Sequence, residues 1–247
     1  MKADLHIHTT ESDGTWAPSR IAQEAKDRGI SVIAITDHDT VAAIGQAQDN
    51  APPGVEVIPG IEISTSIGQS GEVHILGYWI RPDHTALKEY IQNMHSSRFE
   101  RAQRIVHKLN QEGISITFDD VLKHTPREIV SRTHIAAALV QAGYVKTKAQ
   151  AFDRWIGVGS PAYVPRPKML PEEAIDLIIA SGGVPVLAHP GLLHDLSLIK
   201  RLAEHRLIGL EVVHSTHSAR KTAYFREVAQ ELGLLPSGGS DCHGPGG

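Results

Sequence analysis

The sequence predicts an α/β protein in which a barrel of about seven strands is interrupted by a helical insertion. Short runs of β-branched and apolar residues recur along the 247-residue chain. Amphipathic segments of helical length separate most of these runs, which is typical of a mostly parallel sheet. About seven such strands favour a barrel over a small open sheet. The alternation stops from residue 97 to 160, where helical segments occur without a strand pattern, so we expect these residues to form the insertion.

The expected strands and helices alternate along the chain. Helices are clearest at residues 18–28 and 171–181, because proline marks the start of each and Gly182-Gly183 follows the second. In chain order the expected strands are KADLHIH, SVIAIT, VEVIPGIEIS, EVHILGYWI, VPVLAH, IGLEVV and, more weakly, LLPSGGS. The expected division is 1–96 for the first part of the barrel, 97–160 for the insertion and 161–247 for the second part.

Composition narrows the class of protein. Hydrophobic residues make up 41% of the chain, as in a globular fold. No apolar run reaches membrane-spanning length, and the N-terminus has no basic segment followed by an apolar one, so we expect a cytoplasmic protein without a membrane partner. The single cysteine, Cys242, excludes an intramolecular disulfide. A net charge of −4 argues against a broad nucleic-acid-binding face, while a local basic pocket remains open.

The first strand carries a His-x-His pattern. Side chains alternate with a period of two along a strand, so His6 and His8 point to one face while Leu5 and Ile7 point to the other. Two imidazoles side by side suit a divalent metal. The alternative is a pair of surface histidines, and the choice depends on whether other ligands reach the same place.

Acidic and imidazole side chains also recur at or near the ends of the other expected strands. Since catalytic groups of parallel α/β barrels converge at the carboxyl ends of the strands, these side chains are expected on one face. Taken singly, each has a simpler explanation, such as a helix N-cap, a core histidine or a polar loop. Taken together they favour metal binding, because independent accidents would not choose the same face. They are Asp13, Asp37, His38, Asp39, Glu62, His74, His189, Asp241 and His243.

These residues lie in motifs that resemble the PHP family, the polymerase and histidinol phosphatase superfamily. DLHIHTTESDG, ITDHDT, PGIEIS, EVHILG, LAHPG and GSDCHG match the family's motifs in order, over nearly the whole chain. ISVIAITDHDT, RFERAQRI and SRTHIA further resemble bacterial metal-dependent phosphoesterases that act on nucleoside 3′,5′-bisphosphates or short 5′-phosphorylated RNA. The resemblance implies a distorted (β/α)7 barrel, the PHP fold, with a helical insertion.

The resemblance also implies three divalent metal ions. Nitrogen and carboxylate ligands without thiolate suit Mn, Fe or Zn. Catalysis is expected from a metal-bridging hydroxide held by Glu62, Asp241, His6 and His8, without a protein nucleophile. Asp37 and Asp39 are expected to orient ligating imidazoles. The implied ligands are His6, His8, Glu62 and Asp241 for the first metal, Asp13, His38 and His243 for the second, and His74 and His189 with bridging Glu62 for the third.

Two segments of the insertion indicate phosphate binding. Arg98 and Arg101 occupy positions in a heptad-spaced apolar stripe that includes Met94 and Ile105, and a guanidinium on such a face fits a phosphate. The alternatives are neutralisation by nearby carboxylates or extension of the side chains into solvent. In SRTHIA, the first amides of a helix with Arg132 and His134 form a possible anion site, or simply a capped helix. Together these residues predict a clamp for a phosphate that does not react.

The sequence therefore predicts a metal-dependent phosphoesterase. The expected substrates are 3′,5′-bisphosphonucleosides, giving the 5′-monophosphate, and short 5′-phosphorylated RNA. One alternative is a urease-like amidohydrolase, but that class needs a bridging modified lysine, and the expected strands have no lysine at their carboxyl ends. Another is a PHP module that binds metal without catalysis. Lost ligands would mark such a module, and all nine implied ligands are present.

Overall fold

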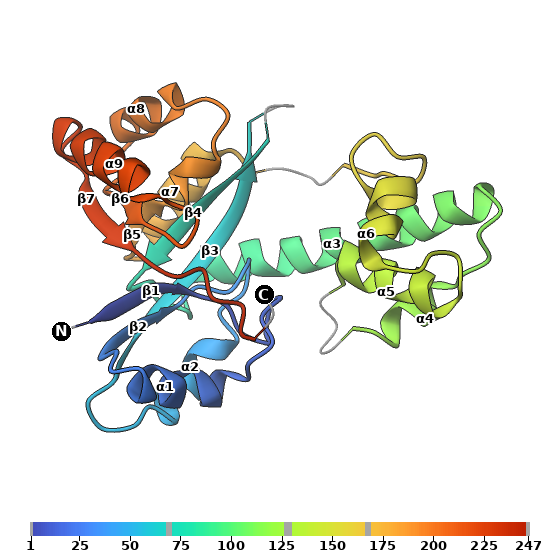
Figure 1. Ribbon diagram of the computed structural model, residues 1–247, viewed down its shortest axis with the longest axis horizontal. Helices are drawn as coiled ribbons and strands as arrows, with labels where there is room; N and C mark the ends of the chain where they lie inside the picture. Colours follow the sequence, from blue (N-terminus) through green and yellow to red (C-terminus); the bar gives the residue numbers. More distant parts are fainter. Residues whose placement is uncertain (1, 68–70, 126–129, 166–168, 246–247) are drawn as a thin grey trace. The chain divides into compact units, whose positions relative to one another are not determined.

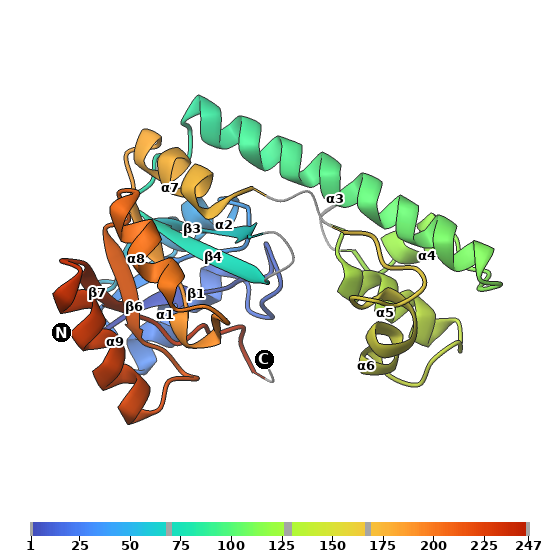
Figure 2. The same cartoon turned by 90° about the horizontal axis from the view of Figure 1, so that it is seen from above.

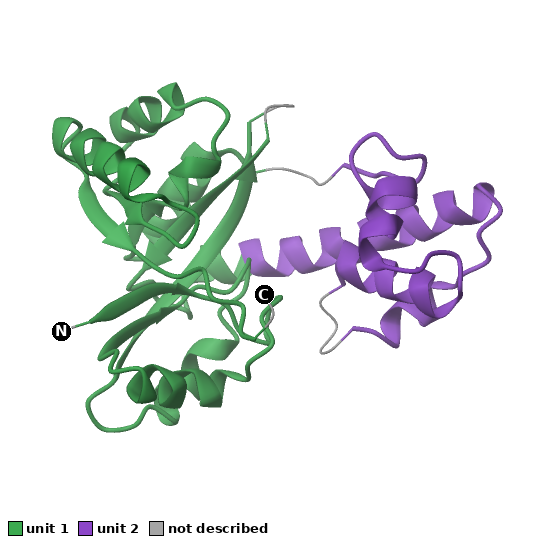
Figure 3. Ribbon diagram, in the orientation of Figure 1, with its two compact units in different colours: residues 1–89, 168–247 green, residues 90–167 purple. Residues whose placement is uncertain are grey.

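The protein has two compact units. The structure is a computed structural model that describes residues 2–67, 71–125, 130–165 and 169–245. Unit 1 comprises residues 1–89 and 168–247, and unit 2 comprises residues 90–167 (Figure 3). Unit 2 includes the expected insertion and extends beyond it at both ends.

Unit 1 is built on a seven-stranded sheet whose strands follow chain order. Only β4 runs antiparallel to its neighbours β3 and β5, and the other pairs are parallel. Beyond β7 the backbone returns to β1, where His8 donates its N–H to the carbonyl of Cys242 at 2.9 Å. The sheet is thus a nearly closed barrel, which confirms the predicted fold (Figure 1). The strands are β1 Ala3–Ile7, β2 Val32–Ile35, β3 Glu56–Ser66, β4 Glu72–Tyr78, β5 Val184–Leu187, β6 Gly209–Val213 and β7 Leu235–Gly238.

Helices cover the outside of the barrel. In Figures 1 and 2, α1 and α2 lie beside the first strands, α7 lies against β4 and β5, and α9 lies against β6 and β7. The short helix η3, Pro190–Leu192, follows β5 directly. The five α-helices of unit 1 that are described in full are α1 Pro18–Asp27, α2 Ala43–Asp49, α7 Pro171–Ala180, α8 Ser197–Glu204 and α9 Ala219–Glu231.

Alternation along the strands produces an outer and an inner apolar cluster. Ile33 and Ile35 pack outward against α1 and α2, whereas Ala34 packs inward with residues of other strands. One expectation for β1 was wrong. Leu5 packs against the inner cluster and Ile7 belongs to the outer one, because the pairing of β1 with β2 is irregular between Asp4 and Ile7.

Among the described residues of unit 2, the regular secondary structure is helical, and loops connect the helices. Its core forms where the apolar face of α3 meets α5, with Ile105, Leu109, Ile135 and Leu139 almost fully buried. Along the described chain, no helix combines the length and the apolar composition that a bilayer crossing requires. The helices are α3 Thr85–Gln111, which starts in unit 1, α4 Phe118–Leu122, α5 Arg132–Gln141, α6 Lys148–Ala151 and the π-helix η2 Phe152–Ile156.

Closure of the barrel depends on Gly239, which follows β7. A Cβ atom at this position would lie 2.3 Å from the Cβ of His6 and 2.6 Å from its backbone nitrogen. Only a residue without a side chain lets this segment approach β1 so closely. The same approach brings the following residues, including Asp241, to the end of β1.

We expect Gly239→Ala to destabilise the protein by about 2 kcal/mol, because the added methyl meets backbone that cannot move independently. Chemical denaturation of the metal-free protein measures this change. Gly45→Ala is the matched control: position 45 lies in α2 with nothing within 4 Å of an added Cβ, so alanine should leave stability unchanged or raise it. Equal effects of the two substitutions would contradict the role of Gly239.

Candidate metal centre

Four side chains from three parts of the barrel surround one point. His6 comes from β1, His8 directly follows β1, Glu62 comes from β3, and Asp241 comes from the segment after β7. The Nε2 atoms of the two histidines lie 3.1 Å apart, and each lies 3.1 to 3.3 Å from Glu62 Oε2 and Asp241 Oδ1. Four ligands of a tetrahedral ion with bonds of about 2.0 to 2.1 Å are separated by about 3.3 Å. The spacing of these four atoms therefore fits a divalent metal.

The protonation of His6 supports the same interpretation. Its Nδ1 lies 3.0 Å from Glu211 Oε1, and an ionised carboxylate only accepts, so Nδ1 carries the proton. In the neutral ring, Nε2 then presents a lone pair to the carboxylates of Glu62 and Asp241. Glu62 Oε2 and His8 Nδ1 are among the buried atoms that have no hydrogen-bond partner in the described part of the chain. A cation among the four atoms described above would satisfy Glu62 Oε2, whereas His8 Nδ1 lies 3.7 Å from Asp13 Oδ1.

A second group lies beside the first. Asp13 comes from the turn after β1, His38 from the turn after β2, and His243 from the segment after β7. Asp13 Oδ1 lies 3.3 Å from His243 Nε2, and Asp13 Oδ2 lies 3.7 Å from His38 Nε2. Donor atoms of these three residues and of His8 lie within 4.8 Å of one another. The predicted second set of ligands is thus together in space.

A third group meets the other oxygen of Glu62. Oε1 lies 3.0 Å from His74 Nδ1 and 3.2 Å from His189 Nε2. Oε2 faces His6 and His8 and lies 3.0 Å from His38 Nδ1. The two oxygens of one carboxylate therefore face different groups, as a bridging ligand requires. His74 reaches this end of the barrel because β4 is antiparallel, so that the start of β4 lies at the carboxyl ends of the parallel strands.

Charges within the centre stabilise one another. Burial opposes ionisation of Glu62, but His38, His6 and His74 hold the pKa of its carboxyl well below the ordinary value. Burial likewise opposes the charge of His8, but the nearby carboxylates of Asp241 and Glu62 raise its pKa to about 10. The carboxylates Glu62 and Glu211 also raise the pKa of His6, again against the effect of burial. Without metal, His6 and His8 thus hold protons.

Two buried residues of the centre were not predicted from the sequence. Glu211 in β6 contacts His6, and the Nε2 of His214, just after β6, lies 3.4 Å from Asp241 Oδ2. A signal for Glu211 was present, because an acid inside the apolar run IGLEVV must point either to solvent or into the barrel. His214 had no comparable signal, since a polar residue after a strand is ordinary.

Asp37 acts on the turn that carries a ligand. Its carboxylate accepts hydrogen bonds from Thr9 N–H at 2.6 Å, from the Thr9 hydroxyl at 2.7 Å and from the Ser12 hydroxyl at 2.6 Å. These bonds order the turn before Asp13. The carboxylate of Asp39 accepts the N–H of Ser64 on β3 at 3.1 Å. For both aspartates these hydrogen bonds go to loop or strand groups and not to an imidazole.

The four residues predicted to hold phosphate all lie in unit 2. Arg98 and Arg101 are half-buried on α3, and the Nε of Arg101 donates to the carbonyl of Val164 at 2.8 Å. At the start of α5, the guanidinium of Arg132 lies 5.4 Å from the ring centre of Phe152. Protein contacts thus hold part of the guanidinium groups of Arg101 and Arg132.

His134 lies close to several cations. Its Nδ1 accepts the N–H of Ser131 at 3.1 Å, so in the neutral ring the proton is on Nε2. Burial, together with Lys148, His124 and Arg98, lowers the pKa of His134. The structure therefore brings Arg98 and His134 into one basic neighbourhood, in which a neutral imidazole offers a hydrogen-bond donor. Burial first, and the neighbouring positive charges second, disfavour the protonated ring.

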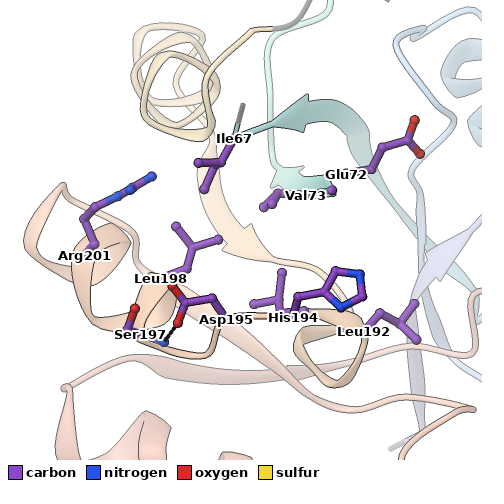
Figure 4. Close-up of a pocket in the computed structure, with 11 residues that line it drawn as sticks. Ile67, Glu72, Val73, Leu192, His194, Asp195, Ser197, Leu198 and Arg201 are labelled. Atoms are coloured by element: carbon purple, nitrogen blue, oxygen red, sulfur yellow. Dashed lines mark hydrogen bonds between the residues drawn. The ribbon is translucent and has the colours of Figure 1, made fainter. Parts of the chain in front are cut away.

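A cavity of about 210 Å³ opens next to the third group. Ile67, Val73 and Leu198 supply apolar walls, and Glu72, His194 and Asp195 supply polar atoms (Figure 4). Glu72 connects the cavity to the centre, because its Oε2 lies 4.0 Å from His74 Nε2. The metal centre is thus flanked by a surface that combines apolar and acidic groups.

Comparisons with known proteins agree with this geometry. The family model described as PHP domain matches residues 4–157. The chain is 35% identical to the 5′-3′ exoribonuclease Rnm of Salmonella typhimurium over 98% of this chain and 85% of that protein. It is also 35% identical to the 3′,5′-nucleoside bisphosphate phosphatase of Chromobacterium violaceum, over 98% and 87%. A solved structure from Bifidobacterium adolescentis, described as a metal-dependent phosphoesterase, superposes with a TM-score of 0.86 at 32% identity, covering 100% of this chain and 89% of that one. The resemblance seen in the motifs is thereby confirmed.

We expect metal binding to release protons. Because carboxylates raise the pKa of His8 to about 10, its imidazole is protonated at pH 7.5 without metal, and a metal ion must displace that proton. Calorimetric titration of metal-stripped protein with Mn²⁺, in two buffers of different ionisation enthalpy, should show roughly one or more protons released per protein. Affinity should rise with pH up to about pH 10. The metal-saturated protein is the control and should release none. Identical heats in both buffers would contradict the protonated cluster.

Proposed function

The chain belongs to the PHP domain family, and on that premise we propose that it hydrolyses phosphate esters of nucleotides at the metal centre of unit 1. The observation that carries this proposal is the arrangement around Glu62, whose two oxygens face imidazoles from separate strands at metal-ligand spacing. A buried carboxylate surrounded in this way could bridge two metal ions.

The donor atoms suit three divalent ions, and Mn, Fe and Zn fit best because imidazole and carboxylate are the ligands present. His6, His8, Glu62 and Asp241 would hold the first ion, Asp13, His38 and His243 the second, and His74 and His189 the third with Glu62 shared. When bound, such ions activate water and offset the charge of the phosphoryl oxygens.

The exposure of these side chains indicates where a phosphate enters. His6, His8 and Glu62 are fully or almost fully buried, whereas the side chain of Asp13 is 50% exposed and that of Asp241 is 26% exposed. A phosphate ester would therefore reach the centre from the side of Asp13 and Asp241. The buried members hold their position because the barrel encloses them, so the site does not have to be rearranged when substrate arrives.

We expect the substrate to be a 3′,5′-bisphosphonucleoside or a short 5′-phosphorylated RNA. The support is similarity over nearly the full chain to relatives named for these two activities. Hydrolysis of the bisphosphate adds water across the P–O3′ bond and gives inorganic phosphate with the 5′-monophosphate. The same cleavage of the first P–O3′ bond of RNA gives the terminal nucleoside 5′-monophosphate and a shortened RNA with a 5′-phosphate. Arg98, Arg101, Arg132 and His134 of unit 2 would bind the phosphate that does not react, because a guanidinium fits phosphate with two parallel hydrogen bonds. Nucleotide substrates are consistent with a cytoplasmic enzyme.

An amidohydrolase reaction is less well supported. That class needs a modified lysine as the bridging ligand, and none of the strands β1 to β7 contains lysine within the described residues. Glu62 would take the bridging position instead. A PHP module that binds metal without catalysis remains as the alternative that an assay decides.

The first test is release of phosphate from adenosine 3′,5′-bisphosphate, AMP and p-nitrophenyl phosphate by protein that has been stripped of metal and reloaded with Mn²⁺. We expect metal-dependent turnover with the highest kcat/KM for the bisphosphate. A 5′-phosphorylated RNA pentamer tests the second substrate class in the same buffer. Binding of metal without turnover of any of these esters would instead support a non-catalytic module.

The role of unit 2 in substrate binding is tested by Arg132→Ala and Arg101→Ala. Losing one charged hydrogen-bond partner should raise KM for the bisphosphate about tenfold or more, while p-nitrophenyl phosphate, which has no second phosphate, is hydrolysed as before. Arg104→Ala is the matched control, since Arg104 is an exposed arginine on the same helix. Equal changes for both substrates would show that these arginines do not bind the second phosphate.

A further inference from the structure

Glu211 is a charged side chain in the interior of the barrel. It lies in the middle of β6, opposite Ser237 of β7, and it is 0% exposed to solvent. Removing a carboxylate from water is unfavourable unless hydrogen bonds or opposite charges compensate. The partners of this carboxylate therefore indicate what it does.

Each oxygen of Glu211 contacts a different predicted metal ligand. Oε1 lies 3.0 Å from His6 Nδ1 on β1, and Oε2 accepts the backbone N–H of His189, after β5, at 2.6 Å. His6 belongs to the first group of ligands and His189 to the third. One carboxylate thus connects two groups that come from opposite parts of the sequence.

The contact with His6 determines which nitrogen can bind metal. Because Glu211 accepts from Nδ1–H, the lone pair of the neutral imidazole is on Nε2, and Nε2 is the atom that lies 3.3 Å from both Glu62 and Asp241. The same bond limits rotation of the ring about its Cβ–Cγ axis. Without it, the ring would lose both the preference for this tautomer and part of its orientation.

The contact with His189 holds an unusual backbone conformation. His189 has φ 28° and ψ 58°, in the positive-φ region that residues other than glycine rarely adopt. This conformation turns the imidazole toward Glu62 Oε1, which lies 3.2 Å from His189 Nε2. The hydrogen bond from His189 N–H to Glu211 fixes the peptide plane from which this conformation starts.

We infer that Glu211 is a positioning residue that aligns His6 for the first metal and His189 for the third. This inference rests on the proposed metal centre. A different role has to be distinguished from it, because donor atoms of His6, Glu211 and His214 lie within 4.8 Å of one another and could themselves be ligands of an ion. The hydrogen-bond lengths to both partners favour positioning, and the number of ions bound at saturation separates the two roles.

The test compares Glu211→Gln and Glu211→Ala with the unaltered full-length protein. Each protein is stripped of metal and titrated with Mn²⁺ against a competing chelator, and the ions bound at saturation are counted by elemental analysis. We expect Glu211→Ala to weaken binding about 10- to 100-fold without reducing the number of ions. Glu211→Gln keeps one acceptor oxygen, enough for one of the two donors, so its loss should be smaller.

A second measurement reports on His6 directly. In Zn²⁺-loaded protein labelled with ¹⁵N-histidine, the His6 Nδ1–H signal should be present in the unaltered protein and should shift or exchange faster in Glu211→Gln. A purely structural role for Glu211 would lower stability without changing this signal. Circular dichroism monitors folding, and if Glu211→Ala does not fold, Glu211→Gln decides the outcome.

Tyr78→Phe is the matched control. Tyr78 is buried in the same barrel, and its hydroxyl lies 3.1 Å from Ser237 Oγ, so the change deletes a buried hydrogen bond at the level of Glu211. We expect unchanged Mn²⁺ affinity. Three results would each overturn the inference. The first is that Tyr78→Phe weakens binding as much as the Glu211 variants do. The others are that both Glu211 variants keep the Mn²⁺ affinity and the His6 signal unchanged, or that a Glu211 variant binds one ion fewer at saturation. Failure of the unaltered protein to bind Mn²⁺ would overturn the metal centre itself.

Discussion

The buried carboxylate of Glu62 is the constraint on which the rest of the barrel depends. It is 1% exposed, and ionising it at such a place is unfavourable unless cations surround it. Imidazoles from β1, from the start of β4 and from the turns after β2 and β5 provide that surrounding, each within 3.3 Å of one of its oxygens. The strand ends that carry these imidazoles must therefore meet at one place, and a nearly closed barrel is the arrangement that brings them together.

Two features of the backbone make this convergence possible. β3 is long enough to pair with β2 through its first half and with β4 through its second, so Glu62 lies just beyond the end of β2. Gly239 then lets the segment after β7 pass against His6, which places Asp241 opposite the two histidines at the end of β1. In both cases the position of a ligand follows from main-chain pairing and not from the ligand itself.

The buried carboxylates have two roles: one faces the place where metal would bind, and the others hold the ligands in position. Glu62 faces the point where ions would lie, while Glu211 lies behind His6 and His189 and Asp37 holds the turn before Asp13. This arrangement of carboxylate behind imidazole is what fixes ring orientation in metal sites generally. Unit 2 differs chemically, because burial and the neighbouring cations Lys148 and Arg98 lower the pKa of His134, and this positive charge could attract an anion.

The sequence by itself determined the fold class and the types of ligand. Strand and helix periodicity predicted all seven strands, because the side-chain pattern of each strand is a local property. His6 with His8, and Asp241 with His243, were recognisable because their spacing places both members at one strand end. His74 could be named as a ligand only through the resemblance, since the reversal of β4 that brings it to the other ligands cannot be read from its own residues.

Only the tertiary structure decided which residues act behind the ligands. Glu211 and His214 gain their role from contacts with His6, His189 and Asp241, which are distant in the chain, and no local pattern records such a contact. The turn around Asp37 and the close approach at Gly239 have the same origin. The physical reason is that hydrogen bonds and steric limits between separate strands depend on how the barrel closes. The side-chain periodicity of one strand shows only which face of the sheet each of its residues occupies.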